Sequence, residues 1–161
     1  MSSQSFVLME EQIDQINAII LRMIKKAEAK CALLVDKDGH LITRQGFTQS
    51  LDTTALSALL AGSFASTKEI ARLVGEPEFS VLFHQGHKDH IHISLVGERC
   101  ILAIVFDDRT TIGMVRLYAK ETSDKLKELL TRAQADNNNA PELDPQFAES
   151  AGSKIDDVFK D

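Results

Sequence analysis

One helix with two unlike apolar faces constrains the fold of this chain most strongly. Residues 55–72 carry apolar side chains at helical spacing, so they predict an α-helix. One side is expected to carry larger residues, namely Leu56, Leu60, Thr67, Ile70 and Val74. The nearly opposite side carries small residues, namely Ala55, Ala58, Gly62, Ala65 and Ser66. A helix that only covers a core needs one stripe of large residues. The second stripe therefore predicts close approach of another backbone.

Gly62 strengthens this interpretation, because a glycine inside a helix costs roughly 1 kcal/mol relative to alanine. Two explanations stay open. The small stripe packs on another element of the same chain, or it meets another chain. Lys68 and Arg72 lie on the polar strip between the two stripes.

The composition indicates one domain and excludes several partners. The chain has 161 residues, 43% of them hydrophobic, which suffices for one core. A net charge of −6 without a basic cluster argues against nucleic-acid binding. No apolar run approaches the ~20 residues of a membrane span, and no secretory signal is visible, so we expect a cytoplasmic protein without membrane insertion.

Cys31 and Cys100 are expected to be buried, reduced thiols, with a disulfide as the less favoured alternative.

The remaining patterns predict an α+β fold. An amphipathic helix over residues 9–26 is followed by a hairpin of residues 31–35 and 41–44, then by the two-faced helix, capped by Asp52 or Thr53 and ended at Gly75. Three strands follow, at residues 79–85, 90–96 and 99–106, and residues 107–110 cap a last helix. The apolar strand 100–106 should be central in the sheet.

This α-β-β-α-β-β-β-α order predicts a five-stranded antiparallel sheet with helices on both faces. The first and last helices would cover one face and the two-faced helix the other. The small stripe would then face outward, which predicts oligomerisation or partner binding. We expect a domain over residues 1–133. From Gln134 the composition predicts a flexible acidic tail over 134–161, with a short docking helix as the alternative.

Catalytic and metal-binding motifs are absent from the sequence. It contains no phosphate-binding loop, no GxSxG nucleophile elbow and no paired CxxC or HExxH motif, so we expect neither an enzyme nor a cofactor. The one suggestive cluster is His84, His87, His90 and His92, in which His84 could lie across from the other strand's histidines. Solvated histidines are favoured there over a metal site. The DKDG turn at residues 36–39 lacks the later ligands of a calcium loop.

Three strings of the sequence resemble the Roadblock family. They are LLVDKDGHLI at 33–42, LLAGSFASTKEIARLVGEPEF at 59–79 and TIGMVRLY at 111–118. The resemblance covers about residues 9–132 and is greatest to the bacterial members that act on a Ras-like GTPase of the MglA type. It implies a homodimer whose sheets join edge to edge with the second helices side by side. It also implies that two protomers bind one GTP-bound GTPase.

The resemblance further implies stimulation of GTP hydrolysis in the control of cell polarity and motility. This would occur by rearrangement of the GTPase's own switch regions and not by an arginine finger from Arg72, Arg109 or Arg116. The residues carried over for the partner-binding helix are Ala55, Ala58, Gly62, Ala65, Ser66 and Glu69, and those for the dimer edge strand are Phe79, Val81 and Phe83. The alternative is a noncatalytic scaffold that tethers a partner. A weaker third hypothesis is a metal or small-molecule sensor using the histidine hairpin.

Overall fold

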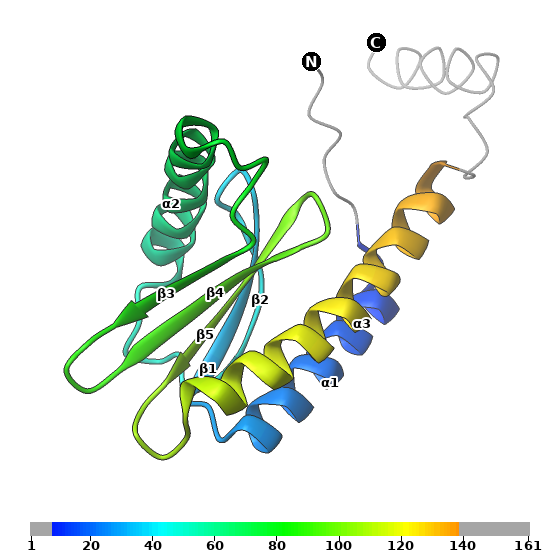
Figure 1. Ribbon diagram of the computed structural model, residues 1–161. Coiled ribbons are helices and arrows are strands. Elements are labelled where there is room, and N and C mark those ends of the chain that lie inside the picture. Colours follow the sequence, from blue (N-terminus) through cyan, green and yellow to red (C-terminus); the bar gives the residue numbers. More distant parts are fainter. Residues whose placement is uncertain (1–7, 139–161) are drawn as a thin grey trace, which may run out of the picture.

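The computed structural model describes residues 8–138, and its element order confirms the predicted one (Figure 1). The elements are α1 (Glu10–Ala27), β1 (Cys31–Asp36), β2 (Leu41–Gly46), α2 (Thr53–Val74), β3 (Val81–Gln85), β4 (His90–Val96), β5 (Cys100–Phe106) and α3 (Ile112–Asn138). None of the helices in this described part is long and apolar enough to cross a membrane.

The strands form one antiparallel sheet in the order β2-β1-β5-β4-β3. Every residue of β5 is buried, as its apolar sequence predicted for a central strand covered on both faces. The hairpin β1–β2 joins the meander β3–β4–β5 through pairing of β1 with β5, so β2 and β3 are left as the two edge strands.

Helices cover both faces of the sheet, as expected. Figure 1 shows α1 and α3 side by side on one face and α2 on the other. Ile20 of α1 and Leu126 of α3 pack with Leu102 in one core cluster, whereas Leu60 and Phe64 of α2 pack on Ile101 in the second. Successive strand residues point to opposite faces, so β5 contributes to both clusters.

The ends of α2 are fixed by local chemistry that the sequence predicted. The side chain of Asp52 accepts a hydrogen bond from the backbone N–H of Ala55 at 3.0 Å, which caps the first turn. Gly75 ends the helix at φ 84°, a left-handed conformation that glycine adopts without strain.

The prediction for the start of α3 was wrong in detail. Asp107 and Asp108 were expected to cap the helix, but the Thr111 hydroxyl accepts from the Met114 N–H at 3.2 Å. Asp107 lies too early in the chain, and it instead accepts hydrogen bonds from the backbone and side chain of Arg109. These bonds hold the pKa of the Asp107 carboxyl below its usual range.

The predicted linker at Gln134 was also placed too early. α3 continues to Asn138, because Ala133 is still buried and extends the packed face of the helix. The rest of the expected tail, residues 139–161, lies outside the described residues.

Cys31 and Cys100 are buried free thiols, as expected. They belong to adjacent strands, but Cys31 packs in the α2-side cluster and Cys100 in the cluster beneath α1 and α3. This placement on opposite faces excludes a disulfide between them. Burial raises the pKa of Cys31 to about 11 and that of Cys100 to about 12, so both thiols stay protonated at neutral pH.

Candidate partner-binding surface

The small stripe of α2 faces outward along its whole length. The predicted helix residues are all exposed, namely Ala55, Ala58, Gly62, Ala65, Ser66 and Glu69. A Cβ atom added to Gly62 would meet no atom within 4 Å. Within residues 8–138, the stripe meets another element closely only at Ala58, which lies beside Gly39 of the β1–β2 turn, and Gly62 stays open.

The prediction of the opposite stripe was partly wrong. Ile70 and Val74 were expected in the core, but they are 52% and 65% exposed. The buried side of α2 instead consists of Thr53, Ser57, Leu60, Ala61, Phe64 and Ala71. Small side chains such as Ala61 and Ala71 allow the helix to approach the sheet closely, and this orientation turns Ile70 and Val74 away from it.

The sequence analysis did not identify two large exposed residues on the outward face of α2. Leu59 is 68% exposed and Leu73 is 77% exposed. Together with Ser66 they recur every seven residues, a spacing that keeps residues on one helix face and could have identified them. The outward face thus combines the small residues with two exposed leucines, Leu59 between Ala58 and Gly62 and Leu73 near the C-terminal end of the helix.

A groove runs between α2 and the edge strand β3. Its cavity volume is about 640 Å³. The side chains and backbone that line it belong to Ala58, Leu59, Gly62, Ser63, Ser66, Thr67, Leu82, Phe83 and His84. The structure therefore brings together three predicted helix residues and one predicted edge-strand residue, while Ala55, Ala65 and Glu69 lie outside the groove lining.

The edge strand β3 offers unpaired backbone groups. The Leu95 N–H donates to the Ser80 carbonyl at 2.9 Å. Because bonded and non-bonded pairs alternate in an antiparallel ladder, the peptide groups of Val81 and Phe83 point away from β4. Phe79 was predicted in this strand but precedes it, since β3 begins at Val81. Such an edge favours pairing with another strand.

Two arginines near these surfaces, Arg72 and Arg109, are paired with carboxylates of the same chain. Arg72 of α2 lies 3.0 Å from the carboxylate of Glu69, and Arg109 lies 3.2 Å from that of Asp107. Exposed pairs of this kind contribute little to stability. Glu69 therefore holds a neighbouring arginine at the rim of the small stripe.

The histidine hairpin differs from the expected solvated cluster. His84 pairs with Ile91, and cross-strand partners share a face, so His84 points to the α2 side. His92 pairs with Phe83 on the opposite side and is buried. The Nδ1 of His90 accepts a hydrogen bond from the Gly86 N–H, and its Nε2 lies 3.4 Å from Asp108. The prediction that His84 lies across from His90 and His92 was wrong.

Asp36, Asp38 and His40 place potential ligand atoms within 4.8 Å of one another at the β1–β2 turn. One carboxylate oxygen of Asp36 already accepts from the backbone N–H groups of Asp38 and His40, at 3.0 and 2.9 Å. These bonds stabilise the turn, so hairpin geometry accounts for the cluster.

A five-stranded sheet between one helix and a helix pair, with an exposed helix face beside an unpaired edge strand, is an arrangement suited to contact with another protein chain. The chain belongs to the Roadblock/LC7 domain family, whose sequence profile matches residues 15–106, more than half of its length. Its α-β-β-α-β-β-β-α architecture is the Roadblock fold.

Solved structures of MglB are similar to this chain over most of their length. MglB from Myxococcus xanthus is 45% identical, with a TM-score of 0.71 covering 73% of this chain and 96% of that one. The gliding protein MglB from Thermus thermophilus is 27% identical, with a TM-score of 0.75 and coverages of 80% and 97%. An uncharacterised protein of Methanocaldococcus jannaschii is 25% identical over 71% of this chain and 98% of its own length.

Proposed function

We propose that this protein is a homodimeric regulator that binds the GTP form of an MglA-type Ras-like GTPase and stimulates its GTP hydrolysis. This activity would serve the control of cell polarity and motility. The observation that carries the proposal is the exposed small stripe of α2, which borders a groove beside an unpaired edge strand. The 45% identity to Myxococcus xanthus MglB supports it.

The dimer would form through the elements that this chain leaves bare. Pairing of two β3 edges would satisfy the outward peptide groups of Val81 and Phe83 and place the two α2 helices side by side. Gly62 and its small neighbours would permit the close approach of those helices. An MglB structure described as having a tetrameric arrangement, 26% identical to this chain with a TM-score of 0.76, is consistent with self-association.

Two protomers would then present their α2 surfaces to one GTPase. No arginine finger is part of the proposal: Arg72 and Arg109 are ion-paired in the free chain, and Arg116 lies near His92 on the face opposite α2. The regulator would therefore act by positioning the switch residues that the GTPase itself supplies. This lowers the barrier through orientation and electrostatic preorganisation.

Phosphate release by the cognate GTPase, measured with and without this protein, tests the proposal directly. We expect acceleration that persists in the Arg72→Ala, Arg109→Ala and Arg116→Ala variants. Binding without acceleration would identify the noncatalytic scaffold instead. Absence of binding to the GTP-loaded GTPase would overturn both functions.

Gly62→Arg tests the assigned surface. The added side chain has open space in the free chain, so the fold should survive, while a close contact at the stripe, with the second α2 helix of the dimer or with the GTPase, would be blocked. We expect at least tenfold weaker GTPase binding in a titration, and a similar loss for Ala58→Arg. Ala18→Arg is the matched control, because Ala18 is an exposed residue of α1 on the other side of the sheet. Unchanged binding by both α2 variants would show that the small stripe is not the contact surface.

A further inference from the structure

A second surface lies on the face of the sheet opposite α2. Val81 pairs with Ser94 and Phe83 with His92, and the Ser94 hydroxyl lies 3.3 Å from that of Ser123 on α3. Val81 and Phe83 therefore point to the α3 side of β3. They remain 44% and 37% exposed, because α3 packs over β4 and β5 and leaves the edge strand uncovered.

Three cations of α3 border this apolar edge. Ser123 identifies the side of α3 that faces β4, and Arg116, Lys120 and Lys127 share that side at helical spacing. None of the three forms an ion pair with another of residues 8–138. Elsewhere on the same helix, Lys125 and Arg132 do pair with acidic residues. The side chains of Arg116, Lys120 and Lys127 are thus available to an acidic partner.

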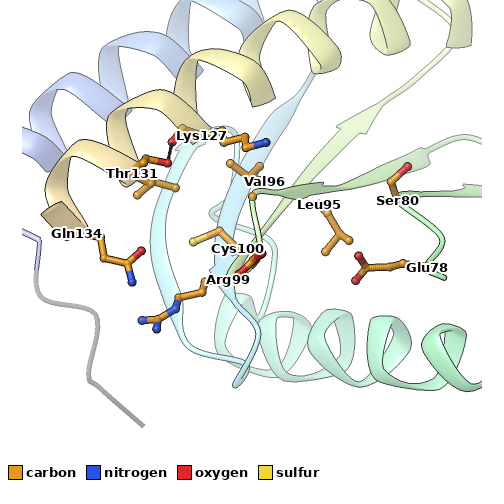
Figure 2. A pocket seen from close by; sticks show the side chains of 12 residues that line it. Glu78, Ser80, Leu95, Val96, Arg99, Cys100, Lys127, Thr131 and Gln134 are labelled. Atoms are coloured by element: carbon orange, nitrogen blue, oxygen red, sulfur yellow. Dashed lines mark hydrogen bonds between the residues drawn. The ribbon is translucent and has the colours of Figure 1, made fainter.

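A pocket continues the surface toward the end of α3. Figure 2 shows it between α3 and the turn that joins β4 to β5, with Lys127 and Thr131 on the helix side. Its volume is about 460 Å³, and Val96 and Leu130 contribute apolar surface to its lining. The carboxylates of Glu78 and Glu98 also line it, so the cationic part of the surface lies on the α3 side, at Lys127. Gln134 also lines the pocket, one turn before α3 ends at Asn138. The surface therefore begins where the chain leaves the helix.

The composition of the chain after α3 complements this surface. Residues 139–161 contain six acidic residues against two lysines, and five large apolar residues among them, namely Leu143, Phe147, Ile155, Val158 and Phe159. The helix from Arg116 to Asn138 is about 33 Å long at 1.5 Å per residue. The following 23 residues could extend to roughly 75 Å. They are long enough to turn and run back along α3.

We propose that residues 139–161 dock on their own protomer along the surface formed by the pocket, the three cations and the β3 edge. Apolar side chains of this segment cover Val81 and Phe83, and its acidic residues lie against Arg116, Lys120 and Lys127. The docked segment occupies the face opposite α2, which the proposed GTPase contact does not use. The inference is independent of the GTPase activity.

Distance measurement between two spin labels tests the docking. The labels are attached to Leu117→Cys and Ser150→Cys in the full chain, which is diluted into excess unlabelled protein so that only distances within one chain contribute. The native thiols are buried and stay unlabelled. We expect a narrow distance distribution in the otherwise unchanged protein. Arg116→Glu/Lys120→Glu should reduce the narrow population several-fold because it replaces attraction by repulsion.

Lys125→Glu/Arg132→Glu is the matched control, with the same change in net charge at cations that already have partners. It should keep the narrow distribution. Phe147→Ser/Phe159→Ser should abolish it without touching the described domain. A broad distribution in the unmodified chain would overturn the proposal, as would a narrow one insensitive to the α3 and phenylalanine changes. A narrow distribution that arises only after addition of the GTPase would assign the surface to that partner instead.

Discussion

His92 belongs to β4, its imidazole lies on the face of the sheet that α1 and α3 cover, and it is only 2% exposed. Its Nδ1 has no hydrogen-bond partner in the described part of the chain. Burial lowers the pKa of His92 below 6.5, and the positive charge of Arg116 lowers it further. The native state therefore holds this side chain neutral where an unfolded chain would protonate it.

This difference predicts a loss of stability in mild acid. As the pH falls through about 6.5, the unfolded state takes up a proton that native His92 does not, so the free energy of unfolding decreases. The contribution of one such group is at most about 1.4 kcal/mol per pH unit. Urea unfolding at about pH 7.5 and pH 5.5 should show a larger decrease in the native sequence than in His92→Gln.

His84→Gln is the control, because His84 is exposed on the opposite face of the sheet. It should leave the pH dependence of the native sequence unchanged. Equal pH dependence in His92→Gln and the native protein would contradict the assignment of the effect to His92.

Among the elements, α2 contains a glycine, Gly62, that lowers the stability of the helix and lies on its exposed face. Gly62 lies within a continuous 22-residue helix, at a position where an added Cβ atom would meet no atom within 4 Å. We expect Gly62→Ala to raise the free energy of unfolding of the isolated chain by about 0.5–1 kcal/mol, because alanine loses less backbone entropy in a helix. Chemical denaturation, with Ala65→Gly as the inverse control, measures this change.

The same substitution should weaken GTPase binding if another backbone approaches Gly62 closely. An increase in the free energy of unfolding together with a loss of GTPase affinity would identify Gly62 as an interface residue. An increase in stability with unchanged affinity would argue against close approach at this position.

The sequence predicted the elements well, because their ends rest on local chemistry such as the Asp52 cap and the left-handed Gly75. It predicted the outward small stripe for the same reason, since helical spacing places Gly62 and Ser66 together. The orientation of α2 was harder to predict. Spacing alone treats Ile70 as a core residue, and only the close packing of Ala61 and Ala71 on the sheet turns it outward.

The strand register, which could not be predicted from the sequence, determines on which face of the sheet each histidine lies and whether it is buried. Alternation predicted that His90 and His92 share a face, but not that α3 would bury that face. The groove between α2 and β3 likewise depends on the placement of two elements relative to each other. Local patterns therefore identified its residues but not its shape.

For the whole molecule, the unpaired edge of β3 determines the proposed assembly. Val81→Pro removes an N–H that points away from β4, and proline is tolerated at the first residue of an edge strand. We expect the variant to fold but to shift the dimer strongly toward monomer in sedimentation velocity measurements.

Val81→Thr is the matched control for this change, since it keeps both the donor and a β-branched side chain. It should remain dimeric at the same concentration. A dimeric Val81→Pro variant would show that the chains do not associate through this edge.

The central pairing of β1 with β5 also has a consequence for how the chain reaches its native state. Residues 31–36 must find residues 100–106, and closing a loop of roughly 70 residues costs several kcal/mol of chain entropy before either core is complete. During synthesis, α1 and the first hairpin therefore wait for β5 to leave the ribosome. Their apolar faces stay uncovered until β5 arrives, and the core layer beneath α1 is completed only when α3 follows β5.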